Sequence, residues 1–447
     1  MSNTFAWGTA SAAYQIEGGY REDGKGDSIW DVYTHELQRT GRGVTGDVAC
    51  DHYHRFREDV RLLAEMGVNA YRFSIAWSRV LPKGTGEINE AGIRFYSDLI
   101  DALLSYGIEP YVTLYHWDLP QALFERGGWL SPEMPEWFYQ YAKLIGERFG
   151  DRVRNFITIN EASNIIEGMQ PGGTNAPALG YSLHDRLTAV HRILLSHGMA
   201  VRALRETVPG VKIGFAPCSG VPCPPADDPA LIARARDDYF AFHRDDLSGG
   251  VVLFSDPIFL GDYPAQYYEW YADVLPDIAP GDMALISQPL DFCCQNIYSG
   301  QKYRSDGDGG WLPDNEGLTY NMLGWAVVPD ALYWGPRFLF ERYGKPVIIT
   351  ENGYCSQDTV AEDGHVHDPE RCRFLTDYLA ALMRAKDDGV DIRGYFYWTC
   401  MDNLEWELGF GPRFGLIHVD FDTQVRTPKD SFYHYRNLIA DHSKGEL

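Results

Sequence analysis

Two glutamates, Glu161 and Glu351, stand directly after apolar segments of the chain. The first follows residues 156–160 (Phe-Ile-Thr-Ile-Asn) and the second follows residues 347–350 (Val-Ile-Ile-Thr). Runs rich in β-branched residues favour buried strands. A buried strand that ends in a carboxylate adds little to a hydrophobic core, but it holds an acid or base rigidly at the mouth of an α/β barrel, where such sites are built. The two glutamates therefore predict a pair of carboxylates that act on one bond.

Further polar and aromatic residues follow, or lie within, other apolar runs. Taken singly, each is explained equally well by a hydrogen bond or an aromatic contact that only supports the fold. Taken together, they fall at the same end of successive predicted strands, which indicates one concave site. Trp, Gln, His, Asn and Glu side chains around such a site suit a neutral polyol better than a phosphate or a hydride carrier. These residues are Gln15, Glu17, Arg72, His116, Trp117, Asp118, Asn296, Tyr298, Trp398, Asp402, Asn403, Glu405 and Trp406.

The elements that would position these side chains alternate regularly. Short β-like runs are separated by longer segments whose apolar residues recur every three or four positions, which is typical of amphipathic helices. Strands that alternate with helices pair in parallel, and eight such units favour a closed barrel. We therefore expect one α/β domain over residues 1–447, a (β/α)8 TIM barrel with long loops at the C-terminal face of the strands. The predicted strands are residues 5–12, 70–75, 109–114, 156–160, 212–216, 292–296, 347–351 and 394–399, and the clearest helices are residues 51–66, 135–149, 185–207 and 371–388.

Composition and charge argue against several classes of function. The formal net charge is −24 and no run of Lys or Arg interrupts the acidic background, so binding to nucleic acid or to an anionic membrane is not expected. No segment is long and apolar enough to span a membrane, and the first residues do not read as a signal peptide. The eight cysteines form no Cys-x-x-Cys pair, which predicts reduced thiols and a cytoplasmic location. The oligomeric state stays open.

Two local patterns have the letters of cofactor or metal motifs but lack the required context. Gly41, Gly43 and Gly46 have the spacing of a dinucleotide-binding fingerprint, yet no apolar strand precedes them. His52 and His54 open an amphipathic helix, where capping and core histidines are common. We therefore expect no cofactor and no metal ion.

Six ordered motifs of the chain match a known family. They are residues 5–18, 71–79, 115–120, 158–161, 349–353 and 402–406. Together they resemble glycoside hydrolase family 1, which comprises β-glucosidases and their relatives on a (β/α)8 barrel, and the resemblance runs from residue 5 to about residue 440. It implies a retaining exo-β-glycosidase that hydrolyses terminal non-reducing β-D-glucosyl residues of small-molecule β-glycosides. It also implies β-galactosidase and β-fucosidase side activity, and a part in the degradation of cellulose and other polysaccharides.

By this resemblance the two glutamates have different roles. Glu161 would be the general acid/base and Glu351 the nucleophile, with their carboxyl groups about 5–5.5 Å apart. Arg72 and Tyr298 would hold Glu351 anionic by charge and hydrogen bonding. The pKa of Glu161, beside that negative charge, would be raised, so that this group stays protonated.

The resemblance also implies the roles of the surrounding residues. Trp398 would be the floor on which the non-reducing-end sugar stacks, and Trp325 would line the leaving-group side. The residues that would hydrogen-bond the hydroxyls of that sugar are Gln15, His116, Asn160, Glu405 and Trp406. Asn160 would meet the 2-hydroxyl, where contacts tighten in the transition state. The supporting residues are Arg72, Asn160, Asn296 and Tyr298, and the substrate-binding residues are Gln15, His116, Trp117, Asn160, Trp325, Trp398, Glu405, Trp406 and Phe414.

The chain departs from the family pattern directly after the acid/base. Ala162 and Ser163 follow Glu161, where the family continues with proline, and this change concerns the leaving-group pocket rather than the acid itself.

Two alternatives to a hydrolase are a transglycosylase of the same family and a non-catalytic carbohydrate-binding barrel. The transglycosylase stays open, because an alcohol could intercept the same covalent intermediate. The two intact glutamates argue against the non-catalytic barrel.

The resemblance also narrows the sugar. Relatives that cleave 6-phosphorylated sugars carry Ser, Lys and Tyr where this chain has Glu405, Pro412 and Phe414. A carboxylate at Glu405 would repel a phosphate, so a neutral sugar is expected.

Overall fold

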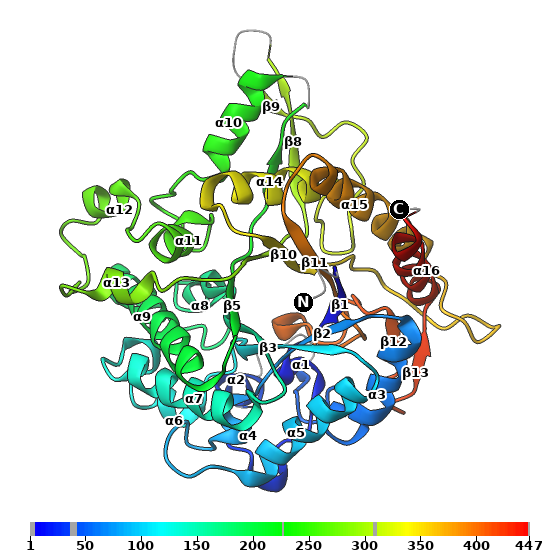
Figure 1. Ribbon diagram of the computed structural model, residues 1–447, viewed down its shortest axis with the longest axis horizontal. Helices are drawn as coiled ribbons and strands as arrows, with labels where there is room; N and C mark the ends of the chain where they lie inside the picture. The colour runs from blue at the N-terminus through cyan, green and yellow to red at the C-terminus, as the bar shows by residue number, and fades with distance from the viewer. Residues whose placement is uncertain (1–4, 36–42, 226–227, 307–310, 446–447) are drawn as a thin grey trace.

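Eight parallel strands form the central sheet of the protein, in the order β5-β4-β3-β2-β1-β11-β10-β7. The structure is a computed structural model that describes residues 5–35, 43–225, 228–306 and 311–445; Gly41 lies outside these ranges. Figure 1 shows the strands at the centre and the helices around them. Every predicted strand is present, and the (β/α)8 fold is confirmed. The strands are β1 (Ala6–Ala10), β2 (Ala70–Ser74), β3 (Glu109–Tyr115), β4 (Asn155–Asn160), β5 (Lys212–Ala216), β7 (Cys293–Asn296), β10 (Val347–Asn352) and β11 (Ile392–Trp398).

The barrel closes between β5 and β7. A parallel bridge joins Cys218 to Asn296, whose N–H donates to the carbonyl oxygen of Pro217 at 2.9 Å. The N–H of Asp291 donates to the carbonyl oxygen of Ile213 at 3.0 Å. Closure gives the edge strands a partner, and it brings the segment after β5 beside the carboxyl end of β7.

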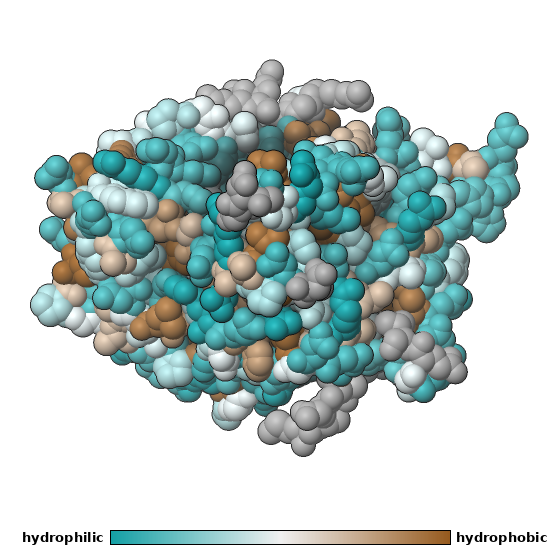
Figure 2. Space-filling model, turned by 90° about the horizontal axis from the view of Figure 1, so that it is seen from above, coloured by the Kyte–Doolittle hydropathy of each residue, from teal (hydrophilic) through white to brown (hydrophobic). Residues whose placement is uncertain are grey.

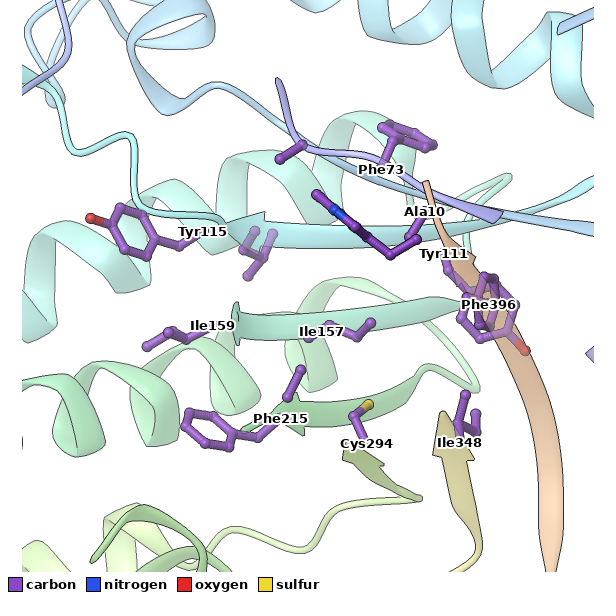
Figure 3. Close-up of a cluster of buried hydrophobic side chains, with 14 of the residues drawn as sticks. Ala10, Phe73, Tyr111, Tyr115, Ile157, Ile159, Phe215, Cys294, Ile348 and Phe396 are labelled. Carbon is purple, nitrogen blue, oxygen red and sulfur yellow. The ribbon is translucent and has the colours of Figure 1, made fainter. Parts of the chain in front are cut away.

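Side chains from successive strands form a continuous buried core. Figure 3 shows Phe73, Tyr111, Ile157, Phe215 and Ile348, from five different strands, gathered in one cluster. Interiors packed in this way deform little. The strand ends are therefore stable supports for the side chains that follow them.

Sixteen α-helices surround and extend this barrel among the described residues. The four clearest predicted helices are present as α3, α7, α9 and α15, with ends within two residues of the prediction. Helix α9 begins with a capping box in which Ser182 and Asp185 bond reciprocally. The helices are α1 (Ala13–Ile16), α2 (Ile29–His35), α3 (His52–Met66), α4 (Trp77–Val80), α5 (Glu90–Ser105), α6 (Gln121–Phe124), α7 (Met134–Phe149), α8 (Ala162–Glu167), α9 (Leu183–Thr207), α10 (Pro229–Tyr239), α11 (Val252–Phe259), α12 (Ala265–Trp270), α13 (Asp282–Ile286), α14 (Ala331–Tyr343), α15 (Pro369–Asp387) and α16 (Asp430–Lys444).

A second sheet lies outside the barrel, in segments for which no strand was predicted. Strand β6 (Val221–Cys223) pairs in parallel with β8 (Gly300–Ser305), and β8 pairs antiparallel with β9 (Trp311–Pro313). Figure 1 shows β8 and β9 projecting from the rim together with α10. No strand was predicted for these short segments because their Pro and Gly residues disfavour strands locally, while pairing partners far along the chain stabilise them. A further pair, β12 (Ile417–Val419) and β13 (Arg426–Pro428), is antiparallel.

One face of the outer surface is mostly polar. Figure 2 shows one face on which hydrophilic residues predominate and hydrophobic residues form small, separate patches. Within the described ranges, no helix has the length and apolar character needed to cross a membrane.

Candidate active site

Left-handed backbone conformations place three of the predicted site residues. Glu161 has a φ of +44°, stands between β4 and α8, and donates its N–H to the carbonyl oxygen of Ala216 at 2.7 Å. Trp117 and Trp406 have φ values of +75° and +45°. Non-glycine residues adopt this conformation at an energetic cost and keep it where the surrounding structure holds them. The turns after the strands, and not the strands alone, therefore direct these side chains.

Glu351 lies between a cation and a phenol. Its Oε1 accepts a hydrogen bond from Nη1 of Arg72 at 2.7 Å, and its Oε2 accepts one from the hydroxyl of Tyr298 at 2.6 Å. Both contacts lower the pKa of Glu351, but burial has the larger effect and raises the pKa above its ordinary value. Burial and the charge of Glu351 also raise the pKa of Tyr298, so this phenol stays protonated and remains a donor. The structure thus places both predicted partners on Glu351, although its net pKa shift is upward.

Glu161 is held by neutral amides in the described part of the chain. Its Oε1 accepts from Nδ2 of Asn296 at 2.7 Å, and its Oε2 accepts from Nδ2 of Asn164 at 2.6 Å. Burial, and after it the negative charge of Glu351, raise the pKa of Glu161 to about 8. At neutral pH Glu161 therefore carries its proton. Glu351 is the carboxyl group that has a cation to balance its charge.

An arginine and two asparagines connect the two carboxyl groups. Nη2 of Arg72 donates to Oδ1 of Asn160 at 2.6 Å, and Nδ2 of Asn296 donates to the same oxygen at 3.1 Å. A further hydrogen bond fixes the guanidinium of Arg72, because its Nε donates to Oγ1 of Thr113 at 3.0 Å. A fully bonded buried network of this kind is rigid, so the relative position of the two carboxyl groups is well defined.

His116 and Gln15 each keep one buried polar atom without a partner among the described residues. Arg72 can only donate, so it faces Oδ1 of Asn160, and Nδ2 of Asn160 donates to Nε2 of His116 at 3.1 Å. Burial, and then the charge of Arg72, lower the pKa of His116 well below its ordinary value. The proton of this neutral ring is therefore on Nδ1, which is the unpartnered atom. Gln15 donates to the carbonyl oxygen of Leu404 at 2.8 Å and leaves its Oε1 unpaired. A hydroxyl-rich ligand would supply the missing partners.

Glu405 differs from the sequence prediction in its charge. Burial and the carboxyl groups of Glu407, Glu351 and Glu161 raise the pKa of Glu405 to about 8. At neutral pH Glu405 is therefore protonated and can both donate to and accept from a hydroxyl. Exclusion of a phosphate then rests less on Glu405 than the sequence suggested. It rests more on the lining of the cavity, which includes no Lys or Arg among the described residues.

Aromatic rings form two walls of the site. Ring centroids of neighbouring pairs in the first group are 4.5–5.8 Å apart, and those in the second group are 5.4–6.0 Å apart. Trp398 is only 3% exposed and lies deep, whereas Trp325 is 37% exposed and stands at the mouth. The first group is His116, Trp117, Trp398 and Trp406, and the second is Tyr298, Trp325 and Phe414.

The predicted catalytic and substrate-binding residues lie around one cavity of about 470 Å³. Four other residues that the sequence placed in this site do not line the cavity, and two of them pair with buried cations instead: Glu17 accepts from Arg79 and Asp402 from Lys429. The four are Glu17, Asp118, Asp402 and Asn403. Gln15, Arg72 and Asn160 lie behind its surface and hydrogen-bond to residues that line it. In the described ranges, no group of three His, Cys, Asp or Glu side chains is placed to hold a metal ion. The predicted residues at the cavity surface are His116, Trp117, Glu161, Asn296, Tyr298, Trp325, Glu351, Trp398, Glu405, Trp406 and Phe414.

Several residues that line this cavity were not predicted from the sequence, among them Asn164, Cys218 and Glu407. Asn164 bonds to Glu161 from the first turn of α8. Glu161 precedes this helix in a left-handed conformation, so helical spacing alone does not predict the contact. Cys218 lies 3.4 Å from Oγ of Ser163; the closure of the barrel brings it there, and no local pattern shows this. Glu407 lines the cavity directly after Trp406.

A buried ion cluster supports the loop that carries Glu405. Lys429 is fully buried; it donates to Oδ1 of Asp402 at 2.7 Å and also to Asp358. Arg413 donates to Oδ2 of Asp402 at 2.7 Å. Each buried charge thus has a partner of opposite sign, as stability requires.

Known proteins with similar sequences indicate the family of this chain. The sequence matches the glycosyl hydrolase family 1 model over residues 1–444. The chain belongs to glycosyl hydrolase family 1. Beta-glucosidase A of Thermotoga maritima is 41% identical over 440 residues, covering 98% of this chain and 97% of the relative. A bifunctional beta-D-glucosidase/beta-D-fucosidase of Bifidobacterium breve is 40% identical and covers 98% of both chains.

A solved structure agrees with this family membership. The beta-glucosidase from Thermotoga maritima in complex with glucoimidazole superposes with a TM-score of 0.89 at 40% identity, over 98% of both chains. The family predicted from the six motifs is confirmed, and so is its fold.

Proposed function

We propose that this family 1 β-glucosidase is a retaining exo-enzyme, with Glu351 as nucleophile and Glu161 as general acid/base. The observation that carries the proposal is the difference between the two carboxyl groups. Glu351 bonds to the Arg72 guanidinium and to the Tyr298 hydroxyl. Glu161 bonds to neutral amides, and its pKa is raised to about 8. A carboxylate that can attack beside an acid that can protonate is the pair that retaining hydrolysis requires.

The reaction then has two steps. In the first, an oxygen of Glu351 attacks the anomeric carbon, the bond to the leaving oxygen breaks, and Glu161 gives its proton to that oxygen. Bond formation removes the negative charge of Glu351, so the pKa of Glu161 falls and its anion becomes a suitable base. In the second step Glu161 takes a proton from water, whose oxygen attacks the same carbon and releases Glu351.

The sugar specificity follows from the closed end of the cavity. A terminal β-glucosyl residue would stack on Trp398 and exchange hydrogen bonds with His116, Gln15 and Glu405, while the leaving group extends toward Trp325. The contacts at Glu405 are adaptable, because the protonated group both donates and accepts. We therefore propose side activity on β-galactosides and β-fucosides, in line with the name of the Bifidobacterium breve relative.

The stereochemistry of the first product tests the proposal. Proton NMR of an aryl β-glucoside reaction should show β-glucose first and α-glucose only later, by mutarotation. Initial α-glucose would show an inverting reaction and overturn the proposal. As a further check, Glu351→Gln should abolish turnover while far-UV circular dichroism and the melting temperature stay those of the wild type.

We also propose a cytoplasmic location. None of the eight cysteines is paired in a disulfide, and six of them are buried. Buried reduced thiols suit a reducing compartment. The test is to fractionate cells and to unfold the protein in the presence of an alkylating agent. We expect the protein in the cytoplasmic fraction, with all eight cysteines alkylated. Recovery outside the cytoplasm, or disulfide-linked peptides, would contradict this.

A further inference from the structure

A second cavity, of about 610 Å³, opens beside the catalytic cavity. The two share Ser219, Gly220, Gly250 and Ser299 in their linings, so they form one continuous groove. We propose that the second cavity binds the distal sugar residues of a β-linked gluco-oligosaccharide, those beyond the first residue of the leaving group. The proposal rests on the proposed function and names the class of substrate that the same site prefers, uncharged oligosaccharides of three or more residues.

One wall of this groove is the small outer sheet. Gln301 and Tyr303 of β8 both line it, as expected for side chains two residues apart on one face of a strand. Figure 1 shows β8 leading away from the barrel rim. From Gly300, next to the shared Ser299, the strand covers about 10 Å to Tyr303 at 3.3 Å per residue. Tyr303 is thus well beyond the junction of the two cavities, outside the reach of a monosaccharide bound there.

Tyr303 is held as a fixed aromatic surface. Its ring stacks on Trp311 of β9 with centroids 3.7 Å apart and an interplanar angle of 13°. The guanidinium of Arg234, from α10, lies 5.4 Å from the Trp311 ring. Trp311 covers one face of the Tyr303 ring, and Tyr303 lines the groove. Sugar rings present flat apolar faces, and a tyrosine that is already ordered loses little entropy on contact with one.

Polar side chains from α10, the segment after it and β8 supply hydrogen-bonding groups to the groove. Asp238, near the end of α10, and His243, after it, line the groove, and neither side chain has a hydrogen-bond partner among the described residues. Gln301 uses its Nε2 on the carbonyl oxygen of Lys302 at 2.9 Å and on Asn315 at 3.2 Å. Its Oε1 accepts no hydrogen bond from the described residues. These groups are available to hydroxyls.

The charge of the groove selects the kind of ligand. Its lining includes the carboxylate of Asp238 and the imidazole of His243, and no Lys or Arg among the described residues. A phosphorylated or carboxylated chain would find no cation there. An aromatic surface together with hydroxyl-binding groups suits a neutral polyhydroxyl chain.

The test compares chain lengths in the wild type and in Tyr303→Ala. Values of kcat/KM are measured for cellobiose, cellotriose, cellotetraose and a nitrophenyl β-glucoside. Tyr433→Ala is the matched control, since Tyr433 is a 41% exposed tyrosine on α16 and lines neither cavity. We expect kcat/KM to rise with chain length in the wild type. Tyr303→Ala should lose about tenfold on cellotetraose and stay unchanged on cellobiose and the nitrophenyl glucoside.

Three outcomes would overturn the proposal. They are no chain-length preference in the wild type, an equal loss on all substrates in Tyr303→Ala, and the same pattern in both variants. If the wild type hydrolysed neither cellobiose nor the nitrophenyl glucoside, the proposed function would fail instead. Calorimetric titration of Glu351→Gln with cellotetraose and cellobiose would then still test whether the groove binds the distal sugar residues. Tighter binding of cellotetraose that disappears when Tyr303→Ala is added supports the proposal, and equal binding of the two sugars refutes it.

Discussion

Replacement of Asn164 by alanine removes one of the two amide donors on Glu161. Nδ2 of Asn164 donates to Oε2 of Glu161 at 2.6 Å, and this bond lowers the pKa of Glu161, which stands at about 8. The donor stabilises the carboxylate more than the neutral acid, so its loss raises the pKa. A hydrogen bond to a charged group contributes about 1.5–3 kcal/mol, which corresponds to about 1–2 pKa units. Water can take the place of the amide and recover part of this, so we expect a rise of about one unit.

The alkaline limb of the pH profile reports this change. Glu161 acts as an acid in its protonated form, so kcat/KM falls above its pKa and the limb should move to higher pH in Asn164→Ala. The measurement is kcat/KM of an aryl β-glucoside with a poor leaving group, from about pH 5 to pH 10, so that protonation of the leaving group matters. Ser163→Ala is the control, because Ser163 is adjacent on the same helix and its hydroxyl bonds to Cys218. An unmoved limb, a limb at lower pH, or equal shifts in both variants would refute our account of Glu161.

Three further predictions concern catalysis and stability. Glu161→Ala should lose far more activity on cellobiose than on a dinitrophenyl glucoside, and azide should restore the latter; equal losses without rescue would mean that another residue is the acid. Lys429→Met leaves the two aspartate partners of the lysine buried without it, so urea unfolding should show a loss of about 3–5 kcal/mol, and a loss below 1 kcal/mol would contradict the buried ion cluster. A Cβ on Gly353 would lie 1.8 Å from the carbonyl oxygen of Trp398, so Gly353→Ala should displace Trp398. We expect a higher KM for glucosides and a loss of about 1–3 kcal/mol in the free energy of unfolding. An unchanged KM would show that Trp398 does not form the sugar floor.

The barrel could be read from the sequence because its signals are local. Residues 347–350 are β-branched, are bounded by Pro346 and followed by a polar residue, and this pattern predicts a buried strand without knowledge of its neighbours. The outer sheet could not be read in this way. Val221–Cys223 contains a proline and pairs with Gly300–Ser305, far along the chain, so its stability comes from the tertiary structure. The groove that we assign to distal sugars was therefore not predictable.

For the two glutamates, too, some properties could be predicted from the sequence and others could not. The positions of Glu161 and Glu351 at strand ends followed from the sequence. Their electrostatics did not, because they depend on burial and on partners brought together by folding. The upward pKa shift of Glu351 despite Arg72, and the protonated state of Glu405 at neutral pH, both come from burial of carboxyl groups in one cavity. Asn164 stands close to Glu161 in sequence, yet its contact depends on the left-handed turn at Glu161.

Trapping of the covalent intermediate tests the central claim most directly. A 2-deoxy-2-fluoro-β-glucoside with a good leaving group should inactivate the protein, because the fluorine slows both steps and the leaving group restores only the first. Mass spectrometry of the intact protein should then show one fluoroglucosyl group per chain, and peptide mapping should place it on Glu351. A label on any other residue, or hydrolysis through an inverting reaction with no label, would contradict the assignment of Glu351 as the nucleophile and Glu161 as its acid.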